Sequence, residues 1–108
     1  MTTKYTTTGK VFSQNRKGLS GLTVEAWDND LLVNDFLGKT TTNKRGVFTI
    51  SFDTSKFSEL SDKSPDIFFK VYRKGVLIHS TEKEVIVNAG DETEVIILLS
   101  SAKDKGSA

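Results

Sequence analysis

Apolar and polar residues alternate along most of the short apolar runs of this chain, and a period of two is typical of β-strands that bury one face. The runs are rich in β-branched and aromatic residues, and Gly or Asn turns separate them. They predict strands near residues 5–13, 22–28, 36–42, 46–52, 66–73, 76–80, 83–88 and 93–99. Strands that are apolar on one face bury it by packing two sheets together, so we predict an all-β fold, an antiparallel sandwich of seven to eight strands.

Turn residues mark the ends of several predicted strands. The segments 15–18 and 43–46 each begin with Asn and end with Gly, and segment 73–75 also ends with Gly. Glycine adopts positive φ without steric cost, so we expect Gly18 and Gly46 to supply the positive φ that a tight reversal needs.

A single segment has the pattern of a helix. Phe57 and Leu60 form an apolar pair at a spacing of three, and either Asp53 or Thr54 can cap the start. The residue before a proline disfavours helical backbone, so the helix should end before Pro65. We therefore predict one short helix near 54–61.

Alternation assigns the side chains of each strand to two faces. The inward set is apolar and forms the predicted core: Leu22, Val24, Ala26, Phe48, Ile50, Phe52, Ile67, Phe69, Val71, Val95, Ile97 and Leu99. The outward set also contains large apolar side chains: Trp27, Phe68, Tyr72, Ile86, Ile96 and Leu98. A solvated sheet face normally alternates more cleanly than this. We therefore predict a binding face that includes Trp27, Phe68, Tyr72, Ile96 and Leu98, part of which the 54–61 helix covers.

Composition excludes several classes of protein. The 15 basic and 14 acidic residues give a net charge of +1, which leaves little excess charge to neutralise phosphates, so we expect no nucleic-acid binding. The absence of cysteine excludes disulfides, thiolate metal sites and a cysteine nucleophile. The longest apolar run, 95–99, is far shorter than the roughly 20 residues of a membrane helix, so we expect no membrane insertion.

The length of 108 residues fits one domain, which we place at 1–99, with 100–108 as a flexible tail or linker because that segment is small and charged. The first residues contain no apolar segment, so we expect no cleaved signal peptide. The compartment itself stays open at this point.

A family resemblance rests on four stretches. They are Gly9-Lys10-Val11, the segment 18–28 (GLSGLTVEAWD), the segment 37–43 (LGKTTTN) and the segment 46–50 (GVFTI). Together they resemble the opening of transthyretin-like domains and of the similar carboxypeptidase regulatory-like domains, both prealbumin-type β-sandwiches. The later segments 51–57, 66–72 and 75–80 resemble versions embedded in very large bacterial proteins, which include relatives of toxin-complex subunits and of contractile secretion-system tips.

The resemblance implies a non-catalytic role. One transthyretin relative hydrolyses 5-hydroxyisourate, and its site would require several histidines and a C-terminal Tyr-Arg-Gly-Ser. This chain has one histidine, His79, and continues after Leu98 with Leu-Ser-Ser. No nucleophile-elbow pattern is present either. We therefore expect no enzyme activity and no cofactor.

Acidic and amide residues crowd the segment between two predicted strands. Asp28, Asp30 and Asp35 offer the hard oxygen ligands that calcium prefers, although their spacing is not that of an EF-hand. Asp and Asn are equally common in turns that they cap themselves, which is the structural alternative. Calcium is therefore a low-ranked prediction for this segment.

These observations favour a structural or protein-interaction module, an adaptor or spacer whose partner is another protein or a neighbouring domain. The resemblance places it in a large bacterial toxin or secretion assembly, exported without a cleaved signal peptide. The alternative is an accessory domain that binds a carbohydrate or calcium. An uncovered edge strand offers a further way to bind a partner, because a strand from that partner can extend the sheet.

Overall fold

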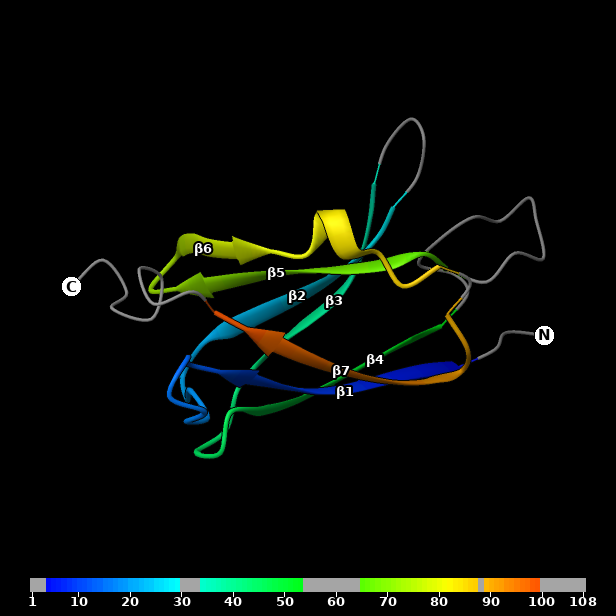
Figure 1. Ribbon diagram of the computed structural model, residues 1–108. Coiled ribbons are helices and arrows are strands. Elements are labelled where there is room, and N and C mark those ends of the chain that lie inside the picture. Colours follow the sequence, from blue (N-terminus) through cyan, green and yellow to red (C-terminus); the bar gives the residue numbers. More distant parts are fainter. Residues whose placement is uncertain (1–3, 30–33, 54–64, 88, 100–108) are drawn as a thin grey trace.

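Two sheets pack face to face in the computed structural model, which describes residues 4–29, 34–53, 65–87 and 89–99. The strands in these ranges are β1 (Lys4–Phe12), β2 (Thr23–Asp28), β3 (Asp35–Thr41), β4 (Val47–Asp53), β5 (Ile67–Arg73), β6 (Val76–Ser80) and β7 (Glu92–Leu98). One sheet has the strand order β4-β1-β7, and the other has the order β3-β2-β5-β6 (Figure 1). The predicted all-β sandwich is confirmed, with seven strands in the described ranges.

Most strand pairs are antiparallel, as predicted, but β7 runs parallel to β1. The reason is topological. The chain leaves β6 in the four-stranded sheet and crosses to the three-stranded sheet, so that β7 enters beside β1 in the same direction. The Cα register of this pair is continuous from Thr6 opposite Glu92 to Phe12 opposite Leu98.

The predicted strand over 83–88 is wrong. The 3-10 helix η2 (Glu82–Glu84) occupies its first part, where two glutamates and a lysine have low β-propensity. Among the described residues 85–87, Ile86 alone pairs with a strand, through two backbone hydrogen bonds of 2.9 and 2.8 Å with Ile67. Ile86 is partly buried against the core, so its predicted outward position is also wrong.

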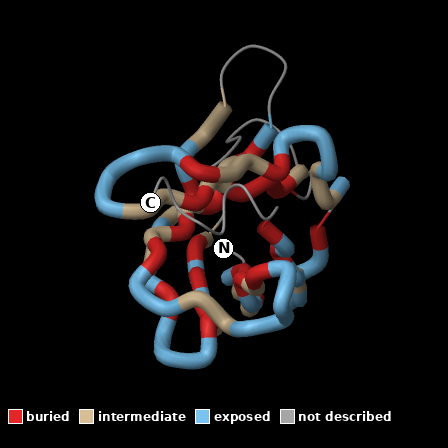
Figure 2. The backbone as a smooth tube through the Cα atoms, turned by 60° about the vertical axis from the view of Figure 1, so that its left-hand side comes forward, coloured by how far each residue is buried: buried red, intermediate tan, exposed pale blue. Residues whose placement is uncertain are grey.

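The core lies between the sheets, and the alternation predicts it well. All of the predicted inward residues except the partly buried Val95 are buried. Figure 2 shows buried positions recurring along the strands while exposed ones gather in the turns. Phe48 of β4 and Phe69 of β5 meet across the core, with ring centroids 5.8 Å apart and planes inclined by 64°. Such edge-to-face pairs add to the free energy of burial.

The two Asn-to-Gly turns pack against each other. Gly46 has the predicted positive φ, of 79°. In the other turn Arg16, not Gly18, takes the positive φ, of 65°, so the prediction for Gly18 is wrong. Gly18 instead permits close approach, because a Cβ built on it would overlap the carbonyl group of Arg45.

Several expectations fall outside the described residues. These are the helix near 54–61 and the flexible tail at 100–108. In the portion that the structure does describe, no helix has the length and hydrophobicity that a bilayer crossing requires.

Candidate functional site

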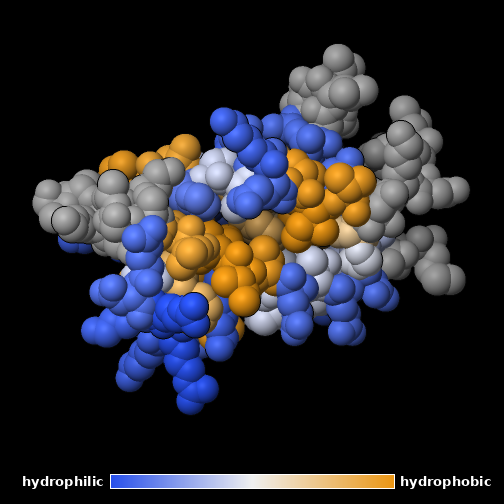
Figure 3. Space-filling view, in the orientation of Figure 1, coloured by the Kyte–Doolittle hydropathy of each residue, from blue (hydrophilic) through white to orange (hydrophobic). Residues whose placement is uncertain are grey.

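The outer face of the three-stranded sheet carries a group of apolar side chains, which we call the apolar patch: Phe12, Val47, Ile96 and Leu98. Ile96 is 71% exposed and Leu98 is 55% exposed, whereas Phe12 and Val47 are half-buried. The register joins them, because Phe12 lies opposite Leu98 and Lys10 lies opposite both Val47 and Ile96. Figure 3 shows apolar surface gathered across the middle of the face on which β7 lies.

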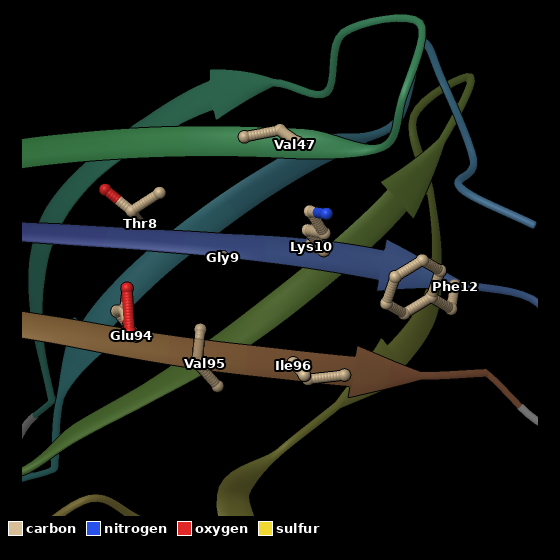
Figure 4. A pocket seen from close by; sticks show the side chains of 8 residues that line it. All are labelled: Thr8, Gly9, Lys10, Phe12, Val47, Glu94, Val95 and Ile96. Carbon is tan, nitrogen blue, oxygen red and sulfur yellow. The ribbon is translucent and has the colours of Figure 1, made fainter. Parts of the chain in front are cut away.

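A shallow, open depression lies within this face. Its lining comes from all three strands of the sheet: Thr8, Gly9, Lys10, Phe12, Val47, Glu94, Val95 and Ile96. Figure 4 shows Lys10 on the middle strand, between Val47 of β4 and Ile96 of β7, with the ring of Phe12 at the end of β1. The Lys10 ammonium lies 5.9 Å from the centroid of the Phe12 ring, within cation–π range.

The same face becomes polar toward the other end of β7. A second depression there is lined by Thr6, Thr8, Glu92, Thr93 and Glu94. The outward positions of β4 at this end are Thr49 and Ser51, and the Ser51 hydroxyl lies 3.3 Å from that of Thr6. The outer face of the sheet therefore has an apolar half and a polar half that carries two carboxylates.

The outer face of the three-stranded sheet combines apolar surface with a few charged groups. The two depressions are open, and their titratable groups are one lysine and two glutamates. No group of three or more His, Cys, Asp or Glu residues that could hold a metal ion occurs among the described residues. What the face offers a ligand is apolar area beside separated charges.

The outer face of the four-stranded sheet carries a different group, which we call the aromatic cluster: Trp27, Phe36 and Tyr72, with Glu25 and Lys70 between them. Trp27 Nε1 donates a hydrogen bond of 3.0 Å to Glu25 Oε1. The Lys70 ammonium lies 4.6 Å from the centroid of the Trp27 ring, and the Phe36 ring meets Trp27 edge to face at 5.4 Å. Contacts within the protein therefore hold Trp27 in place and cover one of its ring faces.

Tyr72 belongs to the aromatic cluster through Glu25. Burial raises the pKa of the Tyr72 phenol above its usual value of 10.0, and the hydrogen bond to Glu25 and the negative charge of Glu25 raise it further. All three causes favour the neutral phenol, which remains the donor to the carboxylate at alkaline pH.

The structure divides the predicted binding residues between two opposite faces. Trp27 and Tyr72 lie on the four-stranded sheet, whereas Ile96 and Leu98 lie on the three-stranded sheet, so the five residues do not form one surface. The prediction that Phe68 is exposed is wrong, because its exposed fraction is 0%. Its position on the outer side of β5 follows the alternation, but other parts of the chain cover it.

The predicted calcium residues do not form a cluster in the ranges that the structure describes. Asp28 is buried, and its Oδ1 accepts a hydrogen bond of 2.9 Å from the backbone N–H of Asp66, which ties the end of β2 to the start of β5. Asp35 pairs with Asp28 across β2 and β3, and Asp30 lies outside the described residues.

Sequence reasoning did not select three residues of these faces: Phe12, Val47 and Phe36. The alternation contained the signal for the first two. Phe12 shares the parity of Lys10 on β1, and Val47 precedes the inward Phe48 on β4, so alternation turns it outward. The chain gives no such signal for Phe36, because a register shift at Ala26/Trp27 determines which residue of β3 meets Trp27. His79 is half-buried on β6, opposite Val71.

Comparison with known proteins identifies the fold and no family. No protein-family model matches the chain, and no curated protein matches it. Among solved structures, the chain is similar to a 9R-lipoxygenase from Cyanothece PCC8801, with a TM-score of 0.60 and 22% identity over 90% of this chain, but it spans 16% of that protein.

Two further structures match over most of their own length. One is the dioxygenase domain of a dioxygenase carbohydrate-binding protein fusion from Streptomyces sp. SirexAA-E, with a TM-score of 0.55, 18% identity and coverage of 91% of this chain and 80% of that one. The other is an alternative pilotin from the type II secretion system of Vibrio cholerae, with a TM-score of 0.56, 18% identity and coverage of 90% and 96%. At these identities the likeness concerns the fold alone.

Proposed function

We propose that this chain is a non-catalytic protein-interaction module that binds its partner through the outer face of the three-stranded sheet. The observation that carries the proposal is the exposure of Ile96 and Leu98, which are 71% and 55% exposed and lie beside Phe12 and Val47. Full burial of such a side chain contributes roughly 1.5–3 kcal/mol, and a partner that covered Ile96 and Leu98 would gain the share that corresponds to their exposed fractions. Grouped apolar side chains on one sheet face are the usual mark of a contact surface.

The non-catalytic part of the proposal concerns the titratable groups of this face. Catalysis by general acid and base needs groups that converge within hydrogen-bond reach of a substrate. Lys10 and Glu94 instead lie on an open surface among apolar and hydroxyl side chains. The solved structures of similar fold include dioxygenases and a secretion-system pilotin. The fold therefore does not identify the function, which must be argued from the site.

We place the module in the transthyretin-like class and in a large bacterial toxin or secretion assembly, as an adaptor or spacer. The resembling stretches support this placement, since their glycines serve the sandwich itself: a Cβ on Gly9 would overlap Phe48 and Val95, and Gly18 and Gly46 pack together. An alternative pilotin from a type II secretion system, at 18% identity, has a similar fold, so this fold does occur in a secretion assembly.

Site-specific photo-crosslinking in the native host tests the proposal. A photo-crosslinking amino acid at position 96 should capture one defined protein, which mass spectrometry identifies. The matched control carries the same amino acid at position 41, where Thr41 is exposed on the opposite sheet. Equal capture from both positions, or none from position 96, would contradict the proposal.

The alternative, an accessory domain that binds a carbohydrate, has one observation in its favour, the half-buried Trp27 in the aromatic cluster. Lys70 covers one face of that ring, which leaves less of it for stacking on a sugar. Titration of oligosaccharides while Trp27 fluorescence is recorded separates the two functions, and we expect no change. A saturable change would favour the alternative, and a calcium-dependent rise in melting temperature would favour its metal form.

A further inference from the structure

Strand β7 forms an edge of the three-stranded sheet. Its neighbour in the sheet is β1, and no other strand of the described ranges pairs with it. The strand is seven residues long, its register with β1 is continuous without a bulge, and it contains neither Lys nor Pro. Bulges, prolines and charged side chains, lysine above all, normally prevent an edge from pairing with another strand, and of these β7 carries two glutamates, both in its first half.

The direction of the β7 backbone groups follows from two hydrogen bonds at its ends. The N–H of Thr6 donates to the carbonyl of Asp91 at 2.8 Å, and the N–H of Leu99 donates to the carbonyl of Phe12 at 2.9 Å. Alternate residues of a strand direct their backbone groups to opposite sides, so the odd-numbered residues face β1. The even-numbered residues therefore direct their N–H and C=O groups toward the open edge: Glu92, Glu94, Ile96 and Leu98.

The other sheet edges differ from β7. The edge strand β4 lies against β3, since a Cβ on Gly38 would come within 3.0 Å of Ile50 Cγ2. The pairing of β3 with β2 is interrupted at Ala26/Trp27, and the short β6 has an irregular register with β5 between Val71 and Tyr72. Among the described strands, β7 is thus the regular edge whose outer side no strand occupies.

The side chains of the same four residues specify what would fit there. Glu92 and Glu94 are exposed, and neither forms an ion pair with another residue of the described ranges. Ile96 and Leu98 are exposed and apolar. Residues directly opposite each other on adjacent strands contact one another, so a matching strand would carry basic residues opposite the glutamates and apolar residues opposite Ile96 and Leu98.

We propose that β7 binds an extended segment of a partner protein, which pairs with it as an additional strand of the three-stranded sheet. The segment runs antiparallel to β7 and presents two apolar residues and then two Lys or Arg residues at alternate positions. This inference deepens the proposed function and rests on it. It assigns the mode of binding, with backbone hydrogen bonds supplying affinity and the alternate side chains supplying specificity.

A second copy of this chain fits the same edge poorly. Full antiparallel pairing of two β7 strands places Glu92 opposite Leu98 and Glu94 opposite Ile96, which leaves each carboxylate beside an apolar side chain. If one copy is shifted by two residues in one direction, Glu94 of each copy lies opposite Glu94 of the other. Like charges directly opposite each other on adjacent strands are unfavourable. Charge complementarity therefore favours a basic and apolar segment over self-association.

Residue-resolved hydrogen exchange with a synthetic heptapeptide tests the proposal. Its outer-face positions read Ile, Val, Lys, Lys from the N-terminus, with Thr between them, and the control peptide carries Glu in place of both Lys. We expect the Lys peptide to slow exchange at the amides of residues 94, 96 and 98 at least about tenfold, while residues 93, 95 and 97, which already face β1, change little. The Glu peptide should bind about tenfold more weakly.

A charge-exchange variant provides the second measurement. Glu92→Lys together with Glu94→Lys changes two exposed side chains, and we expect it to reverse the preference between the two peptides. Binding of the Lys peptide without the alternating protection would overturn strand addition, as would an unchanged preference in the variant. Protection of residues 94, 96 and 98 in the free protein, with sedimentation as a dimer, would identify a second copy as the occupant and overturn the proposal.

These outcomes are separable from failure of the proposed function. Crosslinking at position 96 reports whether the outer face meets a partner at all, whatever the backbone does. Successful crosslinking without the alternating protection would leave the interaction surface intact and remove strand addition alone. Alternating protection by the Lys peptide without crosslinking in the host would support the edge chemistry and refute the proposed surface as a cellular contact.

Discussion

Two neighbouring isoleucines of β7 provide the sharpest test of how this strand is oriented. Ile97 is 2% exposed and packs in the core, whereas Ile96 is 71% exposed on the outer face. Each loses the same atoms when it is replaced by Ala, and each loses the same β-branched side chain from the same strand. The difference between Ile97→Ala and Ile96→Ala therefore isolates the contribution of burial.

The expected magnitudes differ widely. Truncation of a buried Ile to Ala costs about 2–5 kcal/mol through lost transfer free energy and the cavity left behind. An exposed substitution usually changes stability by less than about 0.5 kcal/mol. Because about 1 kcal/mol corresponds to roughly 4–8 °C in a domain of this size, Ile97→Ala should lower the melting temperature by about 8–40 °C. The Ile96→Ala variant should melt within about 4 °C of the parent.

Urea denaturation followed by circular dichroism measures both free energies of unfolding, and an unchanged slope with urea shows that the comparison is valid. A difference below about 1 kcal/mol between the variants would refute the assigned faces of β7. A larger loss for Ile96→Ala would mean that the strand is shifted by one residue, which exchanges its two faces. In either case the apolar patch and the proposed edge pairing would lose their basis.

Three further predictions concern the scaffold. Gly18→Ala should cost about 1–3 kcal/mol, because its Cβ would overlap the neighbouring turn, whereas Gly90→Ala, which meets no atom closer than 3.9 Å, should cost less than about 0.5 kcal/mol by urea denaturation. Thr42→Val should cost about 1–3 kcal/mol, because the buried hydroxyl donates a 2.6 Å hydrogen bond and accepts one of 3.0 Å; the same loss in the exposed Thr41→Val would argue against this cause. The phenol of Tyr72 has a raised pKa in the folded protein, so the stability that its neutral form contributes is present below pH 10.0 and is lost as pH rises through the raised pKa. Tyr72→Phe should flatten this decline in denaturation at increasing pH, and equal declines in variant and parent would refute the assignment.

The sequence predicted the strands better than the surfaces. Alternation placed seven strands within one or two residues of their observed bounds, because a half-buried strand requires that pattern whatever its neighbours are. The strand predicted over 83–88 is wrong, because the charged residues Glu82–Glu84 form the 3-10 helix η2. Alternation also failed for Phe68, whose parity is correct but whose exposure depends on what packs over the sheet.

The candidate site depended even more on tertiary structure. Trp27 and Ile96 both point outward, but parity along a strand carries no information about which sheet the strand joins, and they lie on opposite faces of the sandwich. The parallel pairing of β7 with β1 likewise depends on where the chain crosses between sheets. The sequence alone does not reveal this pairing, so it cannot show which side of β7 lacks a described neighbouring strand or which backbone groups point there.

The sequence by itself therefore determined three things: that the chain forms short amphipathic strands, which of their residues face the core, and where several turns lie. The reason is that backbone sterics and hydrophobic burial act over a few neighbouring residues. The packed structure decided which outward residues meet, why Gly18 must lack a side chain and which sheet edge has no further strand beside it among the described strands. Those properties arise from contacts between segments far apart in the sequence, and the energy of such a contact belongs to the pair rather than to either segment.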